Sequence, residues 1–152
     1  MLVCLLTVSI GHSQALESQK SNPVSQYEVR EFTYEDAQLL LKITAAEAGN
    51  QSLEGQIAVM TVILNRTYSD NPMWPDSIRE VIYQAHQFST VSNGTIETVE
   101  IGPTTHQALA EIEKGIPLDT EIVAFETVGR GSLTRYFDSA YTIGDHQFYK
   151  LK

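Results

Sequence analysis

Hydrophobic residues recur at helical spacing from about residue 33 onward. Leu40 and Ile43 share one face of a predicted helix with Glu47. The helix begins at Thr33, a capping residue, and ends at the Gly-Asn pair 49–50, which suits a left-handed C-terminus. Because a carboxylate is costly to bury without partners, Glu47 on this apolar face raises the question of a functional need.

A second predicted helix, residues 52–66, is apolar around nearly its whole circumference, which is typical of a helix at the centre of a core. The remaining pattern predicts helices at 76–84 and 104–114, an extended segment at 87–91, and short strands at 121–127, around Tyr136 and at 144–151. Helices therefore precede a small antiparallel sheet in the C-terminal half, so the expected fold class is α+β and mainly helical.

Composition limits the classes of function. The 152 residues fit one domain, and 42% hydrophobic residues are enough for a real core. A formal net charge of -9 argues against nucleic-acid binding and against attachment to anionic membranes, because both require a basic surface.

The N-terminus resembles an export signal. Residues 2–10 are apolar but too short to span a bilayer, and Ser-Gln-Ala at 13–15 resembles a signal-peptidase site. No basic residue precedes Lys20, which leaves open a truncated signal or an ordinary buried helix. The expected division is a signal peptide at 1–15, a polar arm at 16–32 and a single domain at 33–152.

Cysteine chemistry is not expected in the exported protein. Cys4 is the only cysteine of the sequence, and it lies in the predicted leader. A nucleophilic thiol and a zinc–thiolate site are therefore both excluded from the domain at 33–152.

Glu47 has two interpretations. It is either a helix-end carboxylate that faces water or a basic partner, or a general acid. Burial and the negative end of the helix dipole both raise the pKa of a carboxyl group, and a raised pKa lets it keep its proton near neutral pH.

Three stretches carry a family resemblance: AEAGNQSLEGQIAVMTVILNR, VIYQAHQFSTV and IGDHQFY. Over residues 34–149 the chain resembles the cell-wall hydrolase family that includes the spore cortex-lytic enzymes. The resemblance implies a lysozyme-like domain that cleaves peptidoglycan between MurNAc and GlcNAc, as a lytic transglycosylase or a muramidase. It also implies that Glu47, in the AEA motif, is catalytic. We expect a monomer without a cofactor, secreted to the cell wall or spore envelope.

The same resemblance indicates residues that bind substrate. The family often has a second acid where this chain has Gln51, so a two-carboxylate mechanism is in doubt and a one-acid transglycosylase is favoured. Asp138, Asp145 and Glu126 stay open as a second acid. The predicted substrate-binding residues are Gln51, Gln87, Phe88, Ser89, Phe125, His146 and Tyr149. Core packing is the competing interpretation for the three aromatic residues, and a structural role is that for His146.

Other motifs are interpreted as structural. Glu54 lies in the first turn of the second helix, where a negative charge favours the helix dipole. Asn65 and Arg66 end that helix, about 18 Å from its start at 1.5 Å per residue, and are predicted to be a cap and surface pair.

Two rival functions remain compatible with the sequence. A metal-dependent peptidase or amidase would use Glu47 with His86, His106 and His146, but no HExxH motif or close histidine pair occurs. A non-catalytic wall-binding or spore protein would keep the fold alone.

Overall fold

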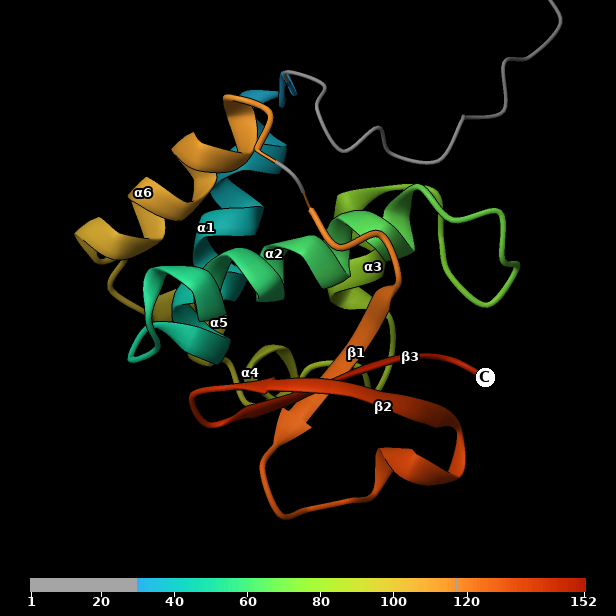
Figure 1. Cartoon of the computed structure of the whole chain (residues 1–152). Helices are drawn as coiled ribbons and strands as arrows, with labels where there is room; N and C mark the ends of the chain where they lie inside the picture. Colours follow the sequence, from blue (N-terminus) through green and yellow to red (C-terminus); the bar gives the residue numbers. More distant parts are fainter. Residues whose placement is uncertain (1–29, 117) are drawn as a thin grey trace, which may run out of the picture.

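The computed structural model describes residues 30–116 and 118–152 (Figure 1). The predicted signal peptide at 1–15 and most of the arm at 16–32 lie outside the described residues. Among the residues that are described, no helix is both long enough and apolar enough to cross a membrane.

A layer of helices lies over a small sheet formed by the end of the chain (Figure 1), which confirms the α+β prediction. The elements are α1 (Tyr34–Ala48), α2 (Leu53–Thr67), α3 (Ile78–Tyr83), α4 (Ser89–Ser92), α5 (Thr95–Thr98), α6 (Pro103–Glu113), β1 (Ile122–Thr127), a 3₁₀ turn (Leu133–Arg135), β2 (Phe137–Ile143) and β3 (His146–Leu151). As predicted, Thr33 caps α1, and its hydroxyl oxygen accepts the backbone N–H of Asp36 at 3.1 Å.

Helix α2 forms the centre of the molecule. It packs against α1, α3 and α6 on the helical side and against β1 of the sheet. Between α2 and α6, the buried side chain of Gln56 accepts a hydrogen bond from Thr105 of α6 at 2.7 Å. The same side chain donates a hydrogen bond to the carbonyl of Gln51 at 3.0 Å. These bonds satisfy a buried amide and fix the loop before α2, next to Glu47.

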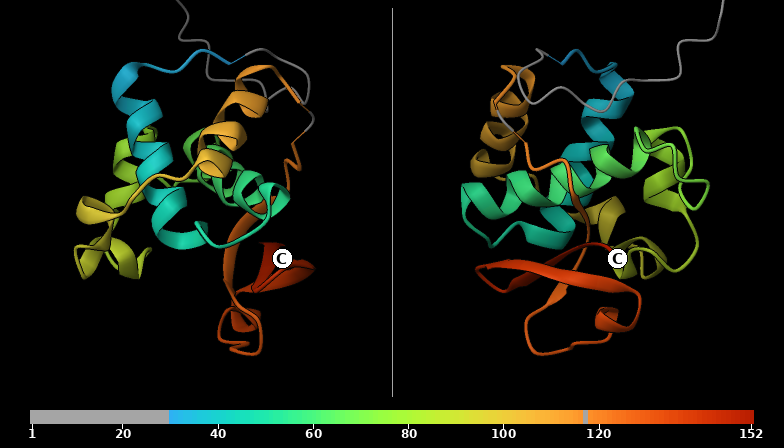
Figure 2. Two further views of the ribbon diagram at one scale, coloured as in Figure 1. Left: turned by 90° about the vertical axis from the view of Figure 1, so that its left-hand side faces the viewer. Right: turned by 45° about the vertical axis from the view of Figure 1, so that its right-hand side comes forward.

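The sheet has the order β1-β3-β2, with both pairs antiparallel (Figures 1 and 2). Phe148 of the central strand is fully buried and faces α2, while β2 is an edge strand that is mostly exposed. In the register, His146 pairs with Thr127 of β1 and with Ile143 of β2. The start of β3 therefore lies at the end of the sheet, beside the β2–β3 turn.

The predicted extended segment at 87–91 is wrong at its second half. Residues from Ser89 onward form α4, and α5 follows after Gly94, whose φ of 80° allows the sharp turn between them. Helices of four residues contain about one turn, so they leave no repeating apolar pattern for a sequence to show. The third helix is also shorter than predicted, because Ser77 caps it one residue before Ile78.

The prediction of a surface pair at the end of α2 is also wrong. Asn65 is 8% exposed and donates hydrogen bonds to the carbonyls of Asp119 and Ile122 at 2.8 and 2.7 Å. Arg66 is 6% exposed and donates to the carbonyl of Val123 at 2.6 Å. Strand β1 covers this end of α2, a contact between distant segments that helical periodicity does not reveal.

Candidate active site

Glu47 lies half-buried in the last turn of α1, beside the short helix α4. The hydroxyl of Thr90 donates a hydrogen bond to Oε1 of Glu47, and the Thr90 backbone N–H donates another. Burial raises the pKa of Glu47, and the two bonds from Thr90 oppose that rise without cancelling it. The direction agrees with the requirement for a general acid.

A hollow of about 340 Å³ opens beside this carboxylate, and we call it the Glu47 hollow. Its lining comes from the α1–α2 loop, the end of β1 and the β2–β3 turn. The lining residues are Glu47, Asn50, Gln51, Thr127, Val128, Asp145 and His146. The structure thus brings two of the predicted binding residues, Gln51 and His146, next to Glu47.

Gln51 joins the α1–α2 loop to the β2–β3 turn. Its Oε1 accepts the backbone N–H of Asp145, and its Nε2 donates to a carboxylate oxygen of Asp145, both at 3.0 Å. Gly144, with φ 55°, allows this approach, because a Cβ there would lie 2.3 Å from the Gln51 oxygen. The turn is therefore held against the loop that follows Glu47.

His146 combines burial with an unused polar atom. The residue is 7% exposed, and its Nδ1 has no hydrogen-bond partner among the residues that the structure describes. Its ring lies 5.1 Å from that of Phe125 and 6.2 Å from that of Phe148. Burial lowers the pKa of His146, against an opposing effect of Asp145, so the imidazole is held toward its neutral form.

Phe125 and Gln87 line a second depression of about 530 Å³, which we call the Arg66 groove. Its lining includes Arg66, Trp74, Gln87, Phe125, Glu126 and Arg130. Ser89 is exposed at the start of α4 and lines neither depression among those described. Four of the predicted binding residues thus fall into two groups, Gln51 with His146 and Gln87 with Phe125, which meet where the rings of Phe125 and His146 contact each other.

Two predicted binding residues lie in the core instead. Phe88 is 5% exposed and packs 6.2 Å from Phe125, and Tyr149 is 2% exposed with its hydroxyl donating to Glu126 at 2.6 Å. Neither ring offers a face to a sugar in this structure, so core packing replaces the predicted contact. Successive residues of a strand face opposite sides of a sheet, so Tyr149 lies on the side away from Phe148, where it is buried beside Glu126.

The three candidate second acids have different surroundings. Asp145 alone lines the Glu47 hollow, whereas Asp138 is exposed on the edge strand β2. Glu126 lies in the Arg66 groove, where its oxygens accept bonds from Ser132 and from the backbone N–H of Leu133 as well as from Tyr149. Burial raises the pKa of Glu126, but these bonds outweigh it and leave the pKa below its ordinary value.

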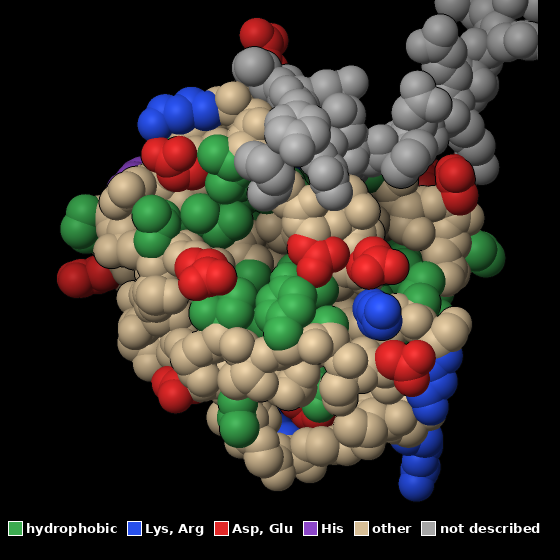
Figure 3. All heavy atoms as spheres, viewed as in Figure 1, with side chains coloured by type: hydrophobic (Ala, Val, Ile, Leu, Met, Phe, Trp, Pro, Cys, Tyr) green, Lys and Arg blue, Asp and Glu red, His purple; other side chains and the backbone are tan. Residues whose placement is uncertain are grey.

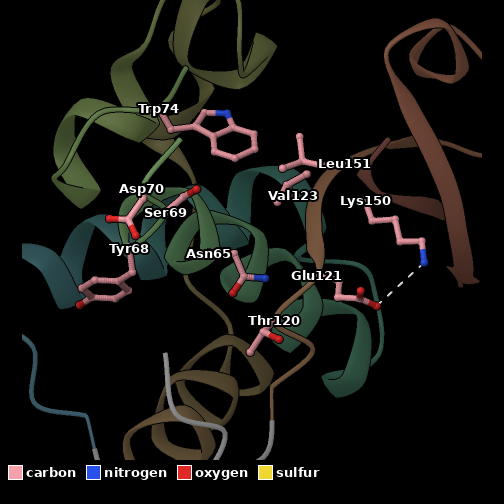
Figure 4. Close-up of a pocket in the computed structure, with 10 residues that line it drawn as sticks. All are labelled: Asn65, Tyr68, Ser69, Asp70, Trp74, Thr120, Glu121, Val123, Lys150 and Leu151. Carbon is pink, nitrogen blue, oxygen red and sulfur yellow. Dashed lines mark ion pairs between the residues drawn. The ribbon is translucent and has the colours of Figure 1, made fainter. Parts of the chain in front are cut away.

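A third pocket, of about 420 Å³, lies at the other end of α2 (Figure 4). Trp74 and Asn65 line it, and Lys150 and Glu121 form an ion pair of 4.0 Å at its side. It contains neither Glu47 nor any predicted site residue, so its larger volume does not make it the candidate active site.

Several residues of the site were missed from the sequence, among them Thr90 and Asn50. Thr90 contacts the candidate acid directly, and Asn50 lines the Glu47 hollow and accepts a hydrogen bond from Gln51 at 3.0 Å. Both belong to the stretches that carried the family resemblance, AEAGNQ and QFST. A contact between them depends on how α4 packs on α1, which the spacing along the chain does not give.

The histidines of the rival metal hypothesis are dispersed. His146 lines the Glu47 hollow and His86 the Arg66 groove, while His106 is exposed on α6. Within residues 30–116 and 118–152, no three histidine, cysteine or acidic side chains are grouped so that they could hold a metal ion.

The architecture defines the class of the domain. The catalytic domain of the germination-specific lytic transglycosylase SleB from Bacillus anthracis superposes with a TM-score of 0.65 at 24% identity, covering 80% of this chain and 98% of that one. The catalytic domain of the Bacillus cereus SleB protein gives 0.68 at 20% identity, with 90% and 100% covered. The chain therefore has the fold of the SleB catalytic domains.

Sequence comparison gives the family. The Cell Wall Hydrolase family profile matches residues 50–149, and the chain belongs to this family. The spore cortex-lytic enzymes of Bacillus subtilis and Oceanobacillus iheyensis are 38% and 37% identical to it over 65 residues, or 43% of this chain. These alignments span 21% and 23% of the relatives' lengths. Glu47 precedes the first residue of the family match, so support for its role comes from its geometry and from the AEA motif.

Proposed function

We propose that this domain cleaves the glycan strands of peptidoglycan between MurNAc and GlcNAc, as a lytic transglycosylase with Glu47 as its acid and base. The main support is the environment of Glu47, which is a half-buried carboxyl group with a raised pKa at the edge of an open hollow. Membership of the Cell Wall Hydrolase family and the printed names of the relatives support the substrate.

The reaction needs a single carboxyl group. Protonated Glu47 donates its proton to the glycosidic oxygen, and the bond from MurNAc C1 to that oxygen breaks with its electron pair leaving on the oxygen. The Glu47 carboxylate then accepts the proton of the MurNAc 6-hydroxyl as this oxygen bonds to C1. The products are a GlcNAc 4-hydroxyl end and a 1,6-anhydro-MurNAc end, and Glu47 is again protonated.

Thr90 and the Gln51–Asp145 contact position this chemistry. The hydroxyl and N–H of Thr90 both hold Glu47, which restricts the carboxyl group to one orientation. Gln51 and His146, which both line the hollow, are proposed to bind the N-acetyl and hydroxyl groups of the sugars.

Simple hydrolysis by a muramidase is the second candidate, because Asp145 shares the hollow with Glu47. A second carboxylate is what an inverting or retaining glycosidase requires. One of its oxygens already accepts the hydrogen bond from Gln51, so the one-acid route is preferred.

The direct test is cleavage of purified peptidoglycan. The wild-type chain should clear a peptidoglycan suspension, and Glu47→Gln should not, because the isosteric amide cannot donate a proton to the leaving oxygen. Unchanged thermal melting would show that the variant is folded. Clearance at the wild-type rate by Glu47→Gln would rule out the assigned acid.

The location follows as part of the proposal. The relatives are named spore cortex-lytic enzymes, so a protein secreted to the cell wall or spore envelope is the setting that fits this activity. The face shown in Figure 3 carries acidic side chains scattered among neutral ones, with Lys and Arg side chains along one edge.

A further inference from the structure

Arg66 is a buried charge without a counter-charge. Its side chain is 6% exposed, and none of the ion pairs in the described part of the chain includes it. Its guanidinium carbon lies 5.9 Å from the centroid of the Trp74 ring and 5.7 Å from that of Phe88. Burial lowers the pKa of Arg66 to about 10, which still leaves it charged at neutral pH. Buried charges are normally paired, so this guanidinium lacks the partner it would be expected to have.

The hydrogen bonds of Arg66 leave donors free. Its Nε donates to the carbonyl of Val123 at 2.6 Å, and one terminal nitrogen donates to Oε1 of Gln87 at 2.9 Å. A guanidinium has five N–H groups, so most of the fork has no partner among the described residues. The other terminal nitrogen has no hydrogen-bond partner among the described residues, yet it is not one of the unpartnered polar atoms that are fully buried. It therefore keeps contact with solvent. Arg66 lines the Arg66 groove, so the contact is made there.

Glu126, the acid that lines the same groove, does not neutralise Arg66. One carboxylate oxygen accepts from Tyr149 at 2.6 Å and from the Leu133 N–H at 3.2 Å, and the other accepts from the N–H and hydroxyl of Ser132. Both oxygens are therefore occupied by neutral donors. Arg130, exposed on the same groove, adds a second positive charge in a chain whose net charge is -9.

We infer that the Arg66 groove is a carboxylate-binding subsite, in which the free N–H groups of Arg66, aided by Arg130, bind a carboxylate of the peptidoglycan strand. A guanidinium fork suits a carboxylate because it can donate two parallel hydrogen bonds. Peptidoglycan has two sources of this group: the lactyl carboxylate of a MurNAc without a stem peptide, and the carboxylates of the stem peptide itself. This inference rests on the proposed function.

The position of the groove fits one continuous substrate. Phe125 lines the Arg66 groove, and its ring contacts His146, which lines the Glu47 hollow. A glycan strand of several sugars can therefore reach the groove while one of its bonds lies at Glu47. The Glu47 hollow would then hold the bond that is cleaved, and the Arg66 groove would bind a charged substituent of the same strand.

A matched pair of ligands tests the subsite without altering the protein. Calorimetry with the Glu47→Gln chain would compare a peptide-free tetrasaccharide of alternating GlcNAc and MurNAc with free lactyl carboxylates and the same sugar as its methyl ester. A second pair would carry stem peptides, with peptide carboxylates either free or esterified. We expect the free acid of at least one pair to bind roughly ten- to a hundredfold more tightly, the range for hydrogen bonds to a charged group.

The pair that shows the difference identifies the source of the carboxylate. Equal binding of acid and ester in both pairs would overturn the subsite. Cleavage of peptidoglycan by the wild-type chain together with such equal binding would leave the proposed function standing, whereas loss of both cleavage and all binding would contradict that function itself.

Protein variants supply a second measurement. In the Glu47→Gln chain, Arg130→Gln should reduce the preference for the acid, and a folded Arg66→Gln variant should abolish it. Arg135→Gln makes the same change of charge at an exposed residue outside the groove, and should leave the preference unchanged. An undiminished preference in both groove variants would contradict the assignment to Arg66.

Discussion

Gln51 and Asp145, which are 94 residues apart in the chain, exchange two hydrogen bonds of 3.0 Å. One bond uses the backbone N–H of Asp145 and the other its carboxylate, so the Gln51 amide is engaged through both its oxygen and its nitrogen. This contact closes the α1–α2 loop against the β2–β3 turn, at the edge of the Glu47 hollow. Gln51 therefore has a structural task that an acid at the same place would perform poorly beside Asp145.

Gly144→Ala should impair activity more than stability. The new Cβ would lie 2.3 Å from the Gln51 oxygen and displace the Gln51–Asp145 contact, in addition to straining a backbone with φ 55°. We expect cleavage to fall by about tenfold, corresponding to about 1.4 kcal/mol, as the turn moves away from Glu47. Initial rates of peptidoglycan clearance would measure it.

Gly131→Ala is the matched control for this change. Gly131 has a similar φ of 62°, but a Cβ there would meet nothing within 4 Å. The control should therefore show the backbone strain alone, as a lower melting temperature with nearly normal cleavage. Equal losses of cleavage in both variants would show that the contact with Gln51 does not matter.

Thr90→Val should shift the pH dependence of cleavage. The Thr90 hydroxyl lowers the pKa of Glu47 against the larger effect of burial, so its removal should let that pKa rise further. An acid must be protonated to act, and activity declines as pH rises through its pKa. The decline should therefore move to higher pH in the variant, while the maximal rate falls because the carboxyl group is less firmly oriented.

Thr90→Ser keeps the hydroxyl and serves as the control. Its pH profile should match that of the wild-type chain, because the hydrogen bond to Glu47 is retained. A Thr90→Val profile that coincides with that of the wild type would show that the hydroxyl does not tune the acting group.

The sequence predicted those parts of the molecule that depend on repeated local pattern. Helices α1 and α2 are each 15 residues long, so their apolar positions recur over several turns. This repetition was enough to predict correctly that Glu47 lies at the end of a helix. The short helix α4 has no such repetition, and with it the contact of Thr90 with Glu47 was missed. Burial of Arg66 was missed for a related reason, since it depends on which strand covers which helix, and for Tyr149 the sequence left core packing and substrate contact as competing interpretations.

Tyr149→Phe should lower stability. Its buried hydroxyl donates to Glu126 at 2.6 Å, and the loss of a bond to a charged group costs about 1 to 3 kcal/mol in the free energy of unfolding. The pKa of Glu126 is lower in the folded protein than its ordinary value of 4.5. The ionised carboxylate therefore stabilises the folded protein above pH 4.5, and this stabilisation is lost as the pH falls through the folded-state pKa. The difference between variant and wild type should therefore shrink in acid.

Urea unfolding at neutral and acid pH would measure this difference, with Tyr136→Phe as the control. Tyr136 is 62% exposed, so removal of its hydroxyl should change stability by less than about 0.5 kcal/mol. A neutral effect of Tyr149→Phe would mean that Glu126 finds another donor in the folded protein.

Cleavage should survive chelation of metals. The acid–base route uses Glu47 alone, and the described residues offer no group of three side chains for a metal ion. Clearance of peptidoglycan should therefore proceed at the same rate after dialysis against excess EDTA. Loss of activity, restored by added zinc, would instead favour a metal-dependent amidase.

The products should end in 1,6-anhydro-MurNAc. With Glu47 as the acting acid, the acceptor that needs no further catalytic group is the substrate's own 6-hydroxyl, which is held beside C1 by the sugar ring. Each released end should be lighter by one water, about 18 Da, than the product of the two-carboxylate hydrolytic route. Mass spectra of digested peptidoglycan would distinguish the two, and ends in reducing GlcNAc would show that the other glycosidic bond is cleaved.

Asp145→Asn then decides between one acid and two. The substitution leaves the backbone N–H that donates to Gln51 in place. The new side-chain amide also has a carbonyl oxygen that can accept the bond from Nε2 of Gln51. The anhydro product should still form at a comparable rate, because no step of the one-acid route uses the Asp145 carboxylate. Reducing-end MurNAc from the wild-type chain, abolished by Asp145→Asn, would instead make Asp145 the base that activates water, as it is the one candidate second acid that lines the Glu47 hollow.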